Sequence, residues 1–471
     1  MLQERLKKLE EIKQAGINPY GGKFLRSHAL DAKMEVGNRV SVAGRIKQLR
    51  GHGKTAFADL KDEKGKIQIY VSFDSLGEEQ GNLFRKLDIG DFLGVEGEIF
   101  LTRTGEMTVK VEKFTLLSKS LRPLPEKWKG LKDVETRYRQ RYLDLISNEE
   151  VKELFHLRSR LIRELREWLD KKGFLEVETP ILQSVPGGAA GKPFKTYQDT
   201  LEMDLYLRIA PELYLKRLLV GGFEKIYELN RSFRNEGIST RHNPEFTMLE
   251  VYEAYADYED MMNLVEELIV HLAEKLLGKK KIVYQGKEVD LTPPWKRLTF
   301  RQAMQDLYGV DIEEEDIKKL TDKLRSAGIK VEGNEVTRTG LVRLLERSLS
   351  ATSPSPTFII DYPAFLCPLA KKKNEKVAER FELFVAGCEL ANAYSELNDP
   401  LEQRERLKIQ KGEEGEDGHL PDEDFVRALE YGMPPAGGLG LGIDRLIMLF
   451  TNSPSIRDVI LFPQLRQGKN L

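Results

Sequence analysis

The sequence predicts an α+β fold in which a small β-barrel precedes a larger domain built from a sheet and helices. From residue 36 to residue 117, five short segments alternate apolar and polar residues and are separated by Gly and Asp/Lys turns. Apolar residues then recur at helical spacing over residues 149–172, and strand-like alternation returns over residues 223–255 and 357–396. We therefore expect at least two folded regions.

The composition is typical of a soluble protein with two or more domains, since 40% of the 471 residues are hydrophobic and 32% are charged. A formal net charge of -2 provides no overall attraction to nucleic acid, so any such binding requires a local patch. Cys367 and Cys388 form no CxxC pair, which argues against a disulfide framework or a structural zinc site. No apolar run is long enough to span a bilayer and the N-terminus lacks a signal-peptide core, so we expect a cytoplasmic protein.

Residues 31–120 hold the barrel, whose five strands indicate the OB type. Such barrels often bind single-stranded nucleic acid by stacking bases on exposed aromatic rings. We expect a base-binding face formed by Arg50, Phe57 and Gln68, although Phe57 taken alone is more typical of a core residue. The nearby GHGKT is not a phosphate loop, because GxxxxGK[ST] requires Gly at the position of Gln48.

Two segments flank this barrel. Residues 1–30 begin with Leu and Ile at helical spacing, with Lys and Arg between them, and predict a short docking helix, with an RNA-facing arm as the alternative. Residues 121–136 are rich in Pro, Lys and Glu and predict a linker. The larger domain then occupies residues 137–471, and its charged, helix-patterned part, about 257–350, predicts an insertion packed on the domain core.

The larger domain opens with an amphipathic helix over residues 149–172, which ends at Gly173. A strand within GFLEVETPIL follows and is closed by Thr179 and Pro180. A buried core helix accounts for this pattern. The apolar stripe consists of Val151, Leu154, Phe155, Leu161, Ile162, Leu165, Trp168 and Leu169.

The stretch 223–255 carries the strongest functional pattern, two strands around a polar loop. Alternation places Glu228 and Arg234 on one face of the first strand, and Phe246 and Glu250 on one face of the second. An arginine fork suits phosphate recognition, an aromatic ring can stack on a purine, and a glutamate can accept from an exocyclic amine. These residues predict a nucleotide site on a sheet, whereas any single Arg–Glu pair is more typical of an ordinary salt-bridged hairpin.

Three further segments carry chemistry. In SVPGGAAGKPF, small residues let the backbone approach a ligand, and Glu212 follows as either a helix N-terminal charge or a pocket residue. Glu382 and Glu389 are expected on adjacent strands, because Gly387 separates them, and paired carboxylates suit magnesium beside a triphosphate. The glycine-rich strand near the C-terminus leads into a helix with Arg445 in its first turns, where helix dipole and guanidinium can face one anion.

The segments GFLEVETPIL, FRNE with RHNPEF, and GLGLGIDR with IRDVILFP resemble, in this order, the three motifs of class II aminoacyl-tRNA synthetases. With PGGAA, RIAPELYLKRL, RHNPEFTMLEVY and ANAYSELND, the whole chain resembles the class II lysyl-tRNA synthetases of bacterial type. The resemblance implies an antiparallel-sheet catalytic domain behind an anticodon-binding OB barrel. It also implies a homodimer whose interface includes the first motif, with tRNA(Lys), L-lysine and ATP as substrates.

The resemblance implies roles for individual residues at the nucleotide. Arg234 and Arg445 would be catalytic, with Arg234 on the α-phosphate of ATP. Glu236 and Phe246 would bind adenine by hydrogen bond and stacking. His242 and Arg445 would lie along the β- and γ-phosphates.

The resemblance also assigns the metal and the amino acid. Glu382, which counts among the ATP-binding residues, and Glu389 would hold Mg²⁺, with up to three ions in all. The lysine pocket would consist of Glu212, Glu250, Tyr252, Asn392, Tyr394 and Glu396.

Charge supports this pocket independently. An ammonium loses several kcal/mol of hydration on burial unless carboxylates replace the water. Glu212, Glu250 and Glu396 provide three acids for the α- and ε-amines of lysine.

The reaction implied has two steps. The lysine carboxylate attacks the α-phosphorus and expels pyrophosphate; it is already ionised, so this step needs no general base, and positioning and charge neutralisation provide the catalysis. The 3′-hydroxyl of tRNA then attacks the adenylate, with no base assigned.

The alternatives are an aspartyl- or asparaginyl-tRNA synthetase, a catalytically silent RNA-binding paralogue, and a ligase that attaches lysine to a protein. SELND and the acidic pocket argue against the first alternative, and the anticodon-binding barrel argues against the third. The second is disfavoured by four intact residues that only catalysis would require, Arg234, Glu382, Glu389 and Arg445. The chain departs from the family at Asp199, Phe365 and Cys367, where Asn, an acidic residue and Ser are common.

Overall fold

The computed structural model describes residues 2–30, 34–125, 131–313, 316–331, 337–349, 354–414 and 422–466. Contacts divide the chain into two compact units, Met1–Arg137 with Tyr142–Asn148, and Tyr138–Arg141 with Glu149–Leu471. Residues 126–130 of the predicted linker lie outside the described residues, as do 314–315, 332–336 and 350 of the predicted insertion.

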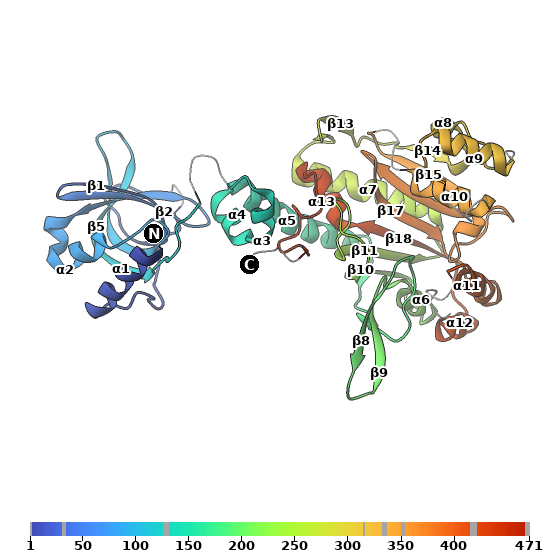
Figure 1. Ribbon diagram of the computed structural model, residues 1–471, viewed down its shortest axis with the longest axis horizontal. Coiled ribbons are helices and arrows are strands. Elements are labelled where there is room, and N and C mark those ends of the chain that lie inside the picture. The colour runs from blue at the N-terminus through green and yellow to red at the C-terminus, as the bar shows by residue number, and fades with distance from the viewer. Residues whose placement is uncertain are drawn as a thin grey trace. The chain divides into compact units, whose positions relative to one another are not determined.

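The first unit is a closed five-stranded barrel, which confirms the predicted fold (Figure 1). Its strands pair in the order β1-β2-β3-β5-β4, and β4 closes the barrel by pairing with β1. Their alternating apolar residues, such as Val42, Ile69 and Val95, fill the interior. The strands are β1 (Arg39–His52), β2 (Thr55–Lys61), β3 (Lys66–Ser72), β4 (Phe92–Leu101) and β5 (Met107–Ser118).

Helices α1 (Leu2–Gln14) and α2 (Phe73–Arg85) pack on this barrel. Ile12 of α1 is fully buried in the barrel core, and Arg5 donates hydrogen bonds to the carbonyls of Ser120 and Ile89. The basic residues of α1 therefore include one that fastens the helix to the barrel.

The second unit is organised around an eight-stranded sheet in the order β14-β15-β16-β17-β18-β11-β10-β6. Its six central strands are antiparallel, whereas the outermost pairs, β14 with β15 and β6 with β10, are parallel. The strands are β6 (Leu175–Glu176), β10 (Lys225–Phe233), β11 (Glu245–Ala254), β14 (Lys296–Thr299), β15 (Thr357–Pro363), β16 (Val377–Val385), β17 (Cys388–Ser395) and β18 (Ala436–Gly442).

Three helices cover one face of this sheet: α5 (Glu149–Lys171), α7 (Tyr258–Leu277) and α13 (Ile443–Thr451). Their buried residues join one core with the sheet residues that alternate toward them, such as Leu249 of β11 and Leu439 of β18. Since neighbouring strand residues point to opposite faces, the polar residues between them point away from this core.

The segment predicted as an insertion, about 257–350, falls into two parts in the structure. Helix α7 buries one side, including Val265 and Leu268, in the main core, so it belongs to the central fold. Its charged residues, such as Glu259, Glu267 and Lys275, lie on the opposite, exposed side. Helices α8 (Phe300–Tyr308), α9 (Ile317–Ser326) and α10 (Arg338–Arg347) form a separate apolar cluster with β15 and β16.

The remaining elements are short. β9 pairs with β7 and β8 in a small three-stranded sheet. Among the described residues, no helix combines the length and apolar character needed to cross a membrane. The remaining helices and strands are α3 (Val134–Arg139), α4 (Arg141–Ser147), β7 (Leu182–Gln183), β8 (Phe194–Gln198), β9 (Met203–Leu207), α6 (Glu212–Val220), β12 (Lys281–Tyr284), β13 (Lys287–Asp290), η3 (Ala364–Leu366), α11 (Pro400–Glu414) and α12 (Glu423–Glu430).

Candidate active site

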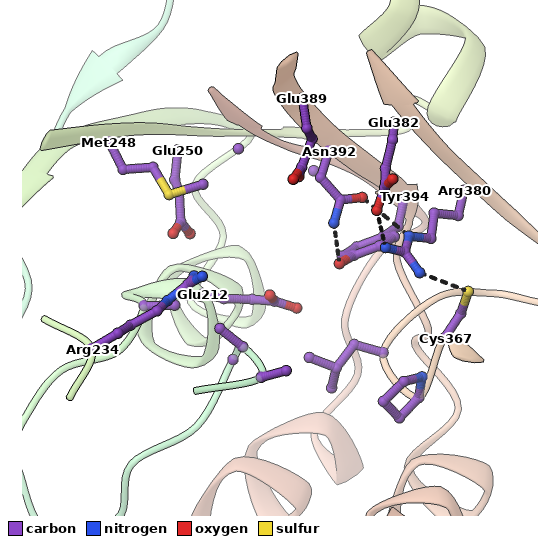
Figure 2. Close-up of a pocket in the computed structure, with 18 of the residues that line it drawn as sticks. Glu212, Arg234, Met248, Glu250, Cys367, Arg380, Glu382, Glu389, Asn392 and Tyr394 are labelled. Atoms are coloured by element: carbon purple, nitrogen blue, oxygen red, sulfur yellow. Dashed lines mark hydrogen bonds and ion pairs between the residues drawn. The ribbon is translucent and has the colours of Figure 1, made fainter. Parts of the chain in front are cut away.

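A cavity of about 840 Å³ lies over the free face of the second unit's sheet. Figure 2 shows side chains converging on it from β11, β16 and β17, with Glu212 opposite them. All the residues predicted to bind ATP, lysine or magnesium line this one cavity. They are Glu212, Arg234, Glu236, His242, Phe246, Glu250, Tyr252, Glu382, Glu389, Asn392, Tyr394, Glu396 and Arg445.

The first end of the cavity contains Arg234 and Phe246. Arg234 directly follows β10, and its backbone N–H donates to the Pro244 carbonyl oxygen at 2.9 Å, which closes the loop onto β11. The guanidinium carbon lies 5.2 Å from the centre of the Phe246 ring. The buried Nε of Arg234 has no hydrogen-bond partner within the described parts of the chain. This arginine can therefore donate to an anion beside an aromatic surface.

A second cationic group lies at Arg445, in the first turn of α13. Its guanidinium donates to the Glu389 carbonyl oxygen at 2.7 Å and to the Glu389 carboxylate at 3.3 Å, and lies 3.4 Å from His242 Nε2. Partial burial and the Arg445 charge lower the pKa of His242, so its ring is neutral near pH 7. Arg241 donates to the Gly387 carbonyl oxygen at 3.1 Å and ties this loop to the β16–β17 turn.

Glu382 and Glu389 occupy adjacent strands, β16 and β17, as predicted, and their carboxylates both face the cavity (Figure 2). The carboxylate of Glu382 accepts from Arg380 and from the Tyr362 hydroxyl. The described residues contain no cluster of three or more acidic, His or Cys side chains able to hold a metal. Mg²⁺ binds proteins through one or two carboxylates together with substrate phosphates, so this donor pair fits an ion that arrives with a nucleotide.

The other end of the cavity is acidic and buried. Glu250 is 4% exposed, and burial, together with Glu212 and Glu228, holds its pKa well above the ordinary value. Glu396 is 1% exposed, and its Oε1 has no hydrogen-bond partner among the described residues. An unpartnered buried carboxylate oxygen is costly unless a ligand donates to it, which favours a cationic ligand here.

Glycines make room for this acidic end. A Cβ added to Gly438 of β18 would overlap the Glu396 carboxylate and lie 2.6 Å from Cε1 of Tyr252. Gly188 has a φ of 84°, and a Cβ there would lie 2.8 Å from Cβ of Glu212. The glycines of β18 and of the loop between β7 and β8 thus allow the acidic side chains to reach the cavity.

Two buried cations beside these acids, Lys216 and Arg380, were not predicted from the sequence. Lys216 of α6 is fully buried, with Nζ 2.7 Å from Glu212 Oε1 and 2.5 Å from Glu396 Oε2. Arg380 of β16 bonds to Glu382 and donates to Asn392 Oδ1 at 3.2 Å. The available signals were the four-residue spacing of Glu212 and Lys216 on a helix and the two-residue spacing of Arg380 and Glu382 on a strand.

Two of the three departures from the family lie at the cavity. Cys367 is buried and contacts Arg380 at 3.6 Å, and burial raises its pKa to about 11, so the thiol stays protonated. Phe365 lines the cavity but is 46% exposed. Asp199 lies between β8 and β9 and is not a lining residue among those the structure describes.

A separate hollow on the barrel contains the three predicted base-binding residues, Arg50, Phe57 and Gln68. Phe57 is half-buried and lies 5.1 Å from Tyr70 between ring centres, so it belongs to this surface rather than to the barrel core. Gln68 donates to Glu106 at 2.9 Å. Aromatic rings beside polar groups in a hollow are suited to stacking and reading unpaired bases.

The family matches of this chain follow its division into a barrel unit and a sheet unit. Residues 133–466 match the family described as tRNA synthetases class II (D, K and N), and residues 40–117 match the OB-fold nucleic acid binding domain. A lysine–tRNA ligase of Carboxydothermus hydrogenoformans is 55% identical over 477 residues, with 99% of this chain and 98% of that protein covered. The enzyme named likewise in Pelotomaculum thermopropionicum is 56% identical (99% and 95% covered), and that of Bacillus subtilis is 49% identical (99% and 97% covered).

Proposed function

Since the chain belongs to the lysine–tRNA ligases of the class II tRNA synthetase family, we propose that its cavity activates lysine with ATP and delivers the lysyl group to the 3′ end of tRNA(Lys). Attachment of lysine to tRNA is the activity for which these relatives are named, and an aspartyl or asparaginyl enzyme or a silent paralogue is not favoured. One observation supports the proposed site most directly. A single cavity joins a cationic end, at Arg234 and Arg445, to an acidic end around Glu396.

At the cationic end the ligand would be ATP. Arg234 would hold the α-phosphate, Phe246 would stack on adenine and Glu236 would accept from its amine. His242 and Arg445 would lie along the β- and γ-phosphates, where a neutral imidazole can still donate one N–H.

Magnesium, up to three ions, would arrive with the phosphates. Glu382 and Glu389 would hold it, and it would neutralise charge that develops on the phosphates. Because Glu382 is bonded to Arg380 and Glu389 to Arg445, these two arginines would keep both carboxylates in place in the free enzyme.

The acidic end would bind L-lysine. Glu212, Glu250 and Glu396 would accept from its two amino groups. The other pocket residues would be Tyr252, Asn392 and Tyr394, of which Asn392 is held by Arg380 and donates to the Tyr394 hydroxyl at 3.1 Å.

Catalysis would then consist mainly of positioning and charge stabilisation. The lysine carboxylate is ionised at neutral pH, so it can attack the α-phosphorus in line while pyrophosphate leaves. Arg234 would stabilise charge on the α-phosphoryl oxygens in the transition state. In the second step the 3′-hydroxyl of tRNA would attack the carbonyl carbon of the adenylate, and AMP would leave.

We also propose the wider setting of this activity. Residues 31–120 would bind the anticodon and residues 137–471 would carry out catalysis, joined through the linker 121–136. The enzyme would be a cytoplasmic homodimer. Leu175 in the short edge strand β6, and Ile181 and Leu182 at β7, are exposed, which supports such an interface because large exposed apolar groups are found at contacts between subunits.

The test is ATP–pyrophosphate exchange by purified protein with magnesium. Exchange should depend on lysine and should not occur with aspartate, with asparagine or without amino acid. Exchange driven by aspartate or asparagine would contradict the lysine assignment, and a folded, ATP-binding protein that shows no exchange would contradict the proposed activation step.

Replacing Phe57 by alanine should weaken the binding of tRNA(Lys) without affecting the activation of lysine by ATP. Stacking of one base on an aromatic ring contributes about 1 to 3 kcal/mol, so KM for tRNA(Lys) should rise by about tenfold or more. Lysine-dependent pyrophosphate exchange should be unchanged. Phe73, which packs on the barrel core away from this hollow, provides a matched control as Phe73→Leu. Unchanged KM for tRNA in Phe57→Ala would contradict the proposed contact.

A further inference from the structure

Lys216 is a buried ammonium that the proposed mechanism does not use. It extends from α6, is fully buried, and lies within 2.7 Å of Glu212 and 2.5 Å of Glu396. Glu212 begins α6 and Glu396 directly follows β17, and Lys216 connects these two separate segments. Among the described residues that line the cavity, Glu212 and Glu396 appear and Lys216 does not, so the ammonium lies behind the carboxylates.

This arrangement changes the charge of the lysine pocket. Burial raises the pKa values of Glu250 and Glu396, so their ionised forms depend on a cationic partner. When Glu212, Glu250 and Glu396 are all ionised around a bound cation, they carry three negative charges. With the ammonium of Lys216, two negative charges remain. Free lysine brings two ammonium groups, the α and the ε, so the charge that remains matches those two groups.

The ion pair with Lys216 also fixes the orientation of the Glu396 carboxylate. Oε2 of Glu396 forms the ion pair with Lys216, whereas Oε1 forms neither an ion pair nor a hydrogen bond within the described residues and faces Gly438. Lys216 therefore holds one oxygen of the carboxylate and leaves the other for a ligand. Glu212 is held in the same way through Oε1.

We propose that Lys216 is a positioning residue that pairs the Glu212 and Glu396 carboxylates and sets the pocket charge for a diamino acid. This inference rests on the proposed function, because it names a determinant of lysine selection at the same site. Lys216 acts through the two glutamates and does not touch the substrate.

The electrostatics of the site agree with this role. Burial raises the pKa of Glu396, to about 8, and Lys216 opposes that rise. Burial lowers the pKa of Lys216, but the two glutamates raise it above its ordinary value overall, so the amine stays protonated and is not a nucleophile. The other groups near Glu396 are Tyr252 with Glu250 on β11 and Tyr394 on β17, and both tyrosines have raised pKa values and remain neutral.

Removing the ammonium should therefore shift the pH dependence in a defined direction. Without Lys216, the pKa of Glu396 rises further, since burial and Glu212 both disfavour its ionised form. Glu396 then keeps its proton to a higher pH, and the variant binds lysine better as the pH rises.

The experiment measures lysine-dependent pyrophosphate exchange from about pH 6 to about pH 8.5, a range that covers the titration of a raised carboxyl. The variants are Lys216→Met and Lys216→Gln; the second keeps amide donors and limits loss of folding. Lys225→Met is the control, because Lys225 forms a more exposed ion pair, with Glu253, at the start of β10. In both Lys216 variants KM for lysine should rise by about tenfold or more near pH 7, with KM for ATP unchanged. The acidic limb of kcat/KM for lysine should move up by about one pH unit.

Three results would overturn the proposal. KM for lysine could remain at the wild-type value in both variants. KM for lysine and for ATP could rise together with no shift of the acidic limb. Both variants could fail to fold while Lys225→Met folds, which would assign the ion pair to stability alone. Failure of the proposed function is separate from these results, because wild-type protein would then show no lysine-dependent exchange.

Discussion

Replacing Arg234 by alanine is expected to lower lysine-dependent ATP–pyrophosphate exchange by about 10²- to 10³-fold, the effect of removing one preorganised donor from a developing oxyanion. The guanidinium lies beside Phe246, and its buried Nε has no hydrogen-bond partner within the described residues, so its donors are available to a phosphate. Most of the loss should appear in kcat, since charge on the α-phosphoryl group is greatest in the transition state.

Two variants make this result interpretable. Arg234→Lys should recover only part of the activity, because an ammonium keeps the charge and loses the planar pair of donors. Arg231→Ala is the control; Arg231 lies near the end of β10, three residues before Arg234, but its guanidinium contacts Thr247 and Glu245 and does not line the cavity among the described residues. If Arg234→Ala and Arg231→Ala exchange at equal rates, the assignment of Arg234 to the α-phosphate is wrong.

Replacing Glu396 by glutamine is expected to lower kcat/KM for lysine by about 10²- to 10³-fold, since truncating one partner of a buried charge pair costs about 2 to 5 kcal/mol. Glutamine keeps the shape of the side chain and cannot ionise, so one of the two ammonium groups of lysine would lose a buried counterion. KM for ATP should change little. Steady-state exchange at varied lysine and varied ATP separates the two effects.

Glu253→Gln is the matched control for this substitution. Glu253 is also a glutamate of a central strand, but it pairs with Lys225 at 2.6 Å and does not line the cavity among the described residues. Its exchange kinetics should be those of wild type. If Glu396→Gln instead raises KM for ATP as much as KM for lysine, the carboxylate supports the whole cavity and is not specific to the amino acid.

The features predicted from sequence are those encoded over short distances. Alternation within β11 is sufficient to place Phe246, Glu250 and Tyr252 on one face, and the register with β10 places Glu228 directly opposite Glu250. The five strands of the barrel follow in the same way from local alternation and turns. Each of these patterns lies within one strand or one hairpin.

The features that were not predicted depend on contacts between distant segments. The spacing of Lys216 and Glu212 in α6 indicates only an ordinary helix ion pair, and the second contact appears when the chain after β17 brings Glu396 within 2.5 Å of Lys216. Arg380 contacts Glu346 of α10 and Asn392 of β17, neither of which its own strand indicates. Phe57 could not be assigned to core or surface, because alternation does not indicate which face of a small barrel holds a hollow.

The strand order of the catalytic sheet has a consequence for biosynthesis. β18 (Ala436–Gly442) pairs with both β11 and β17, although it is the last strand of the sheet to be made. While the ribosome is still translating the preceding residues, β11 and β17 have no shared neighbour, and Arg445 has not been added. The nascent chain therefore cannot assemble the phosphate and lysine ends of the site together. A polypeptide that terminates before this strand should therefore bind both ATP and lysine more weakly than the complete enzyme.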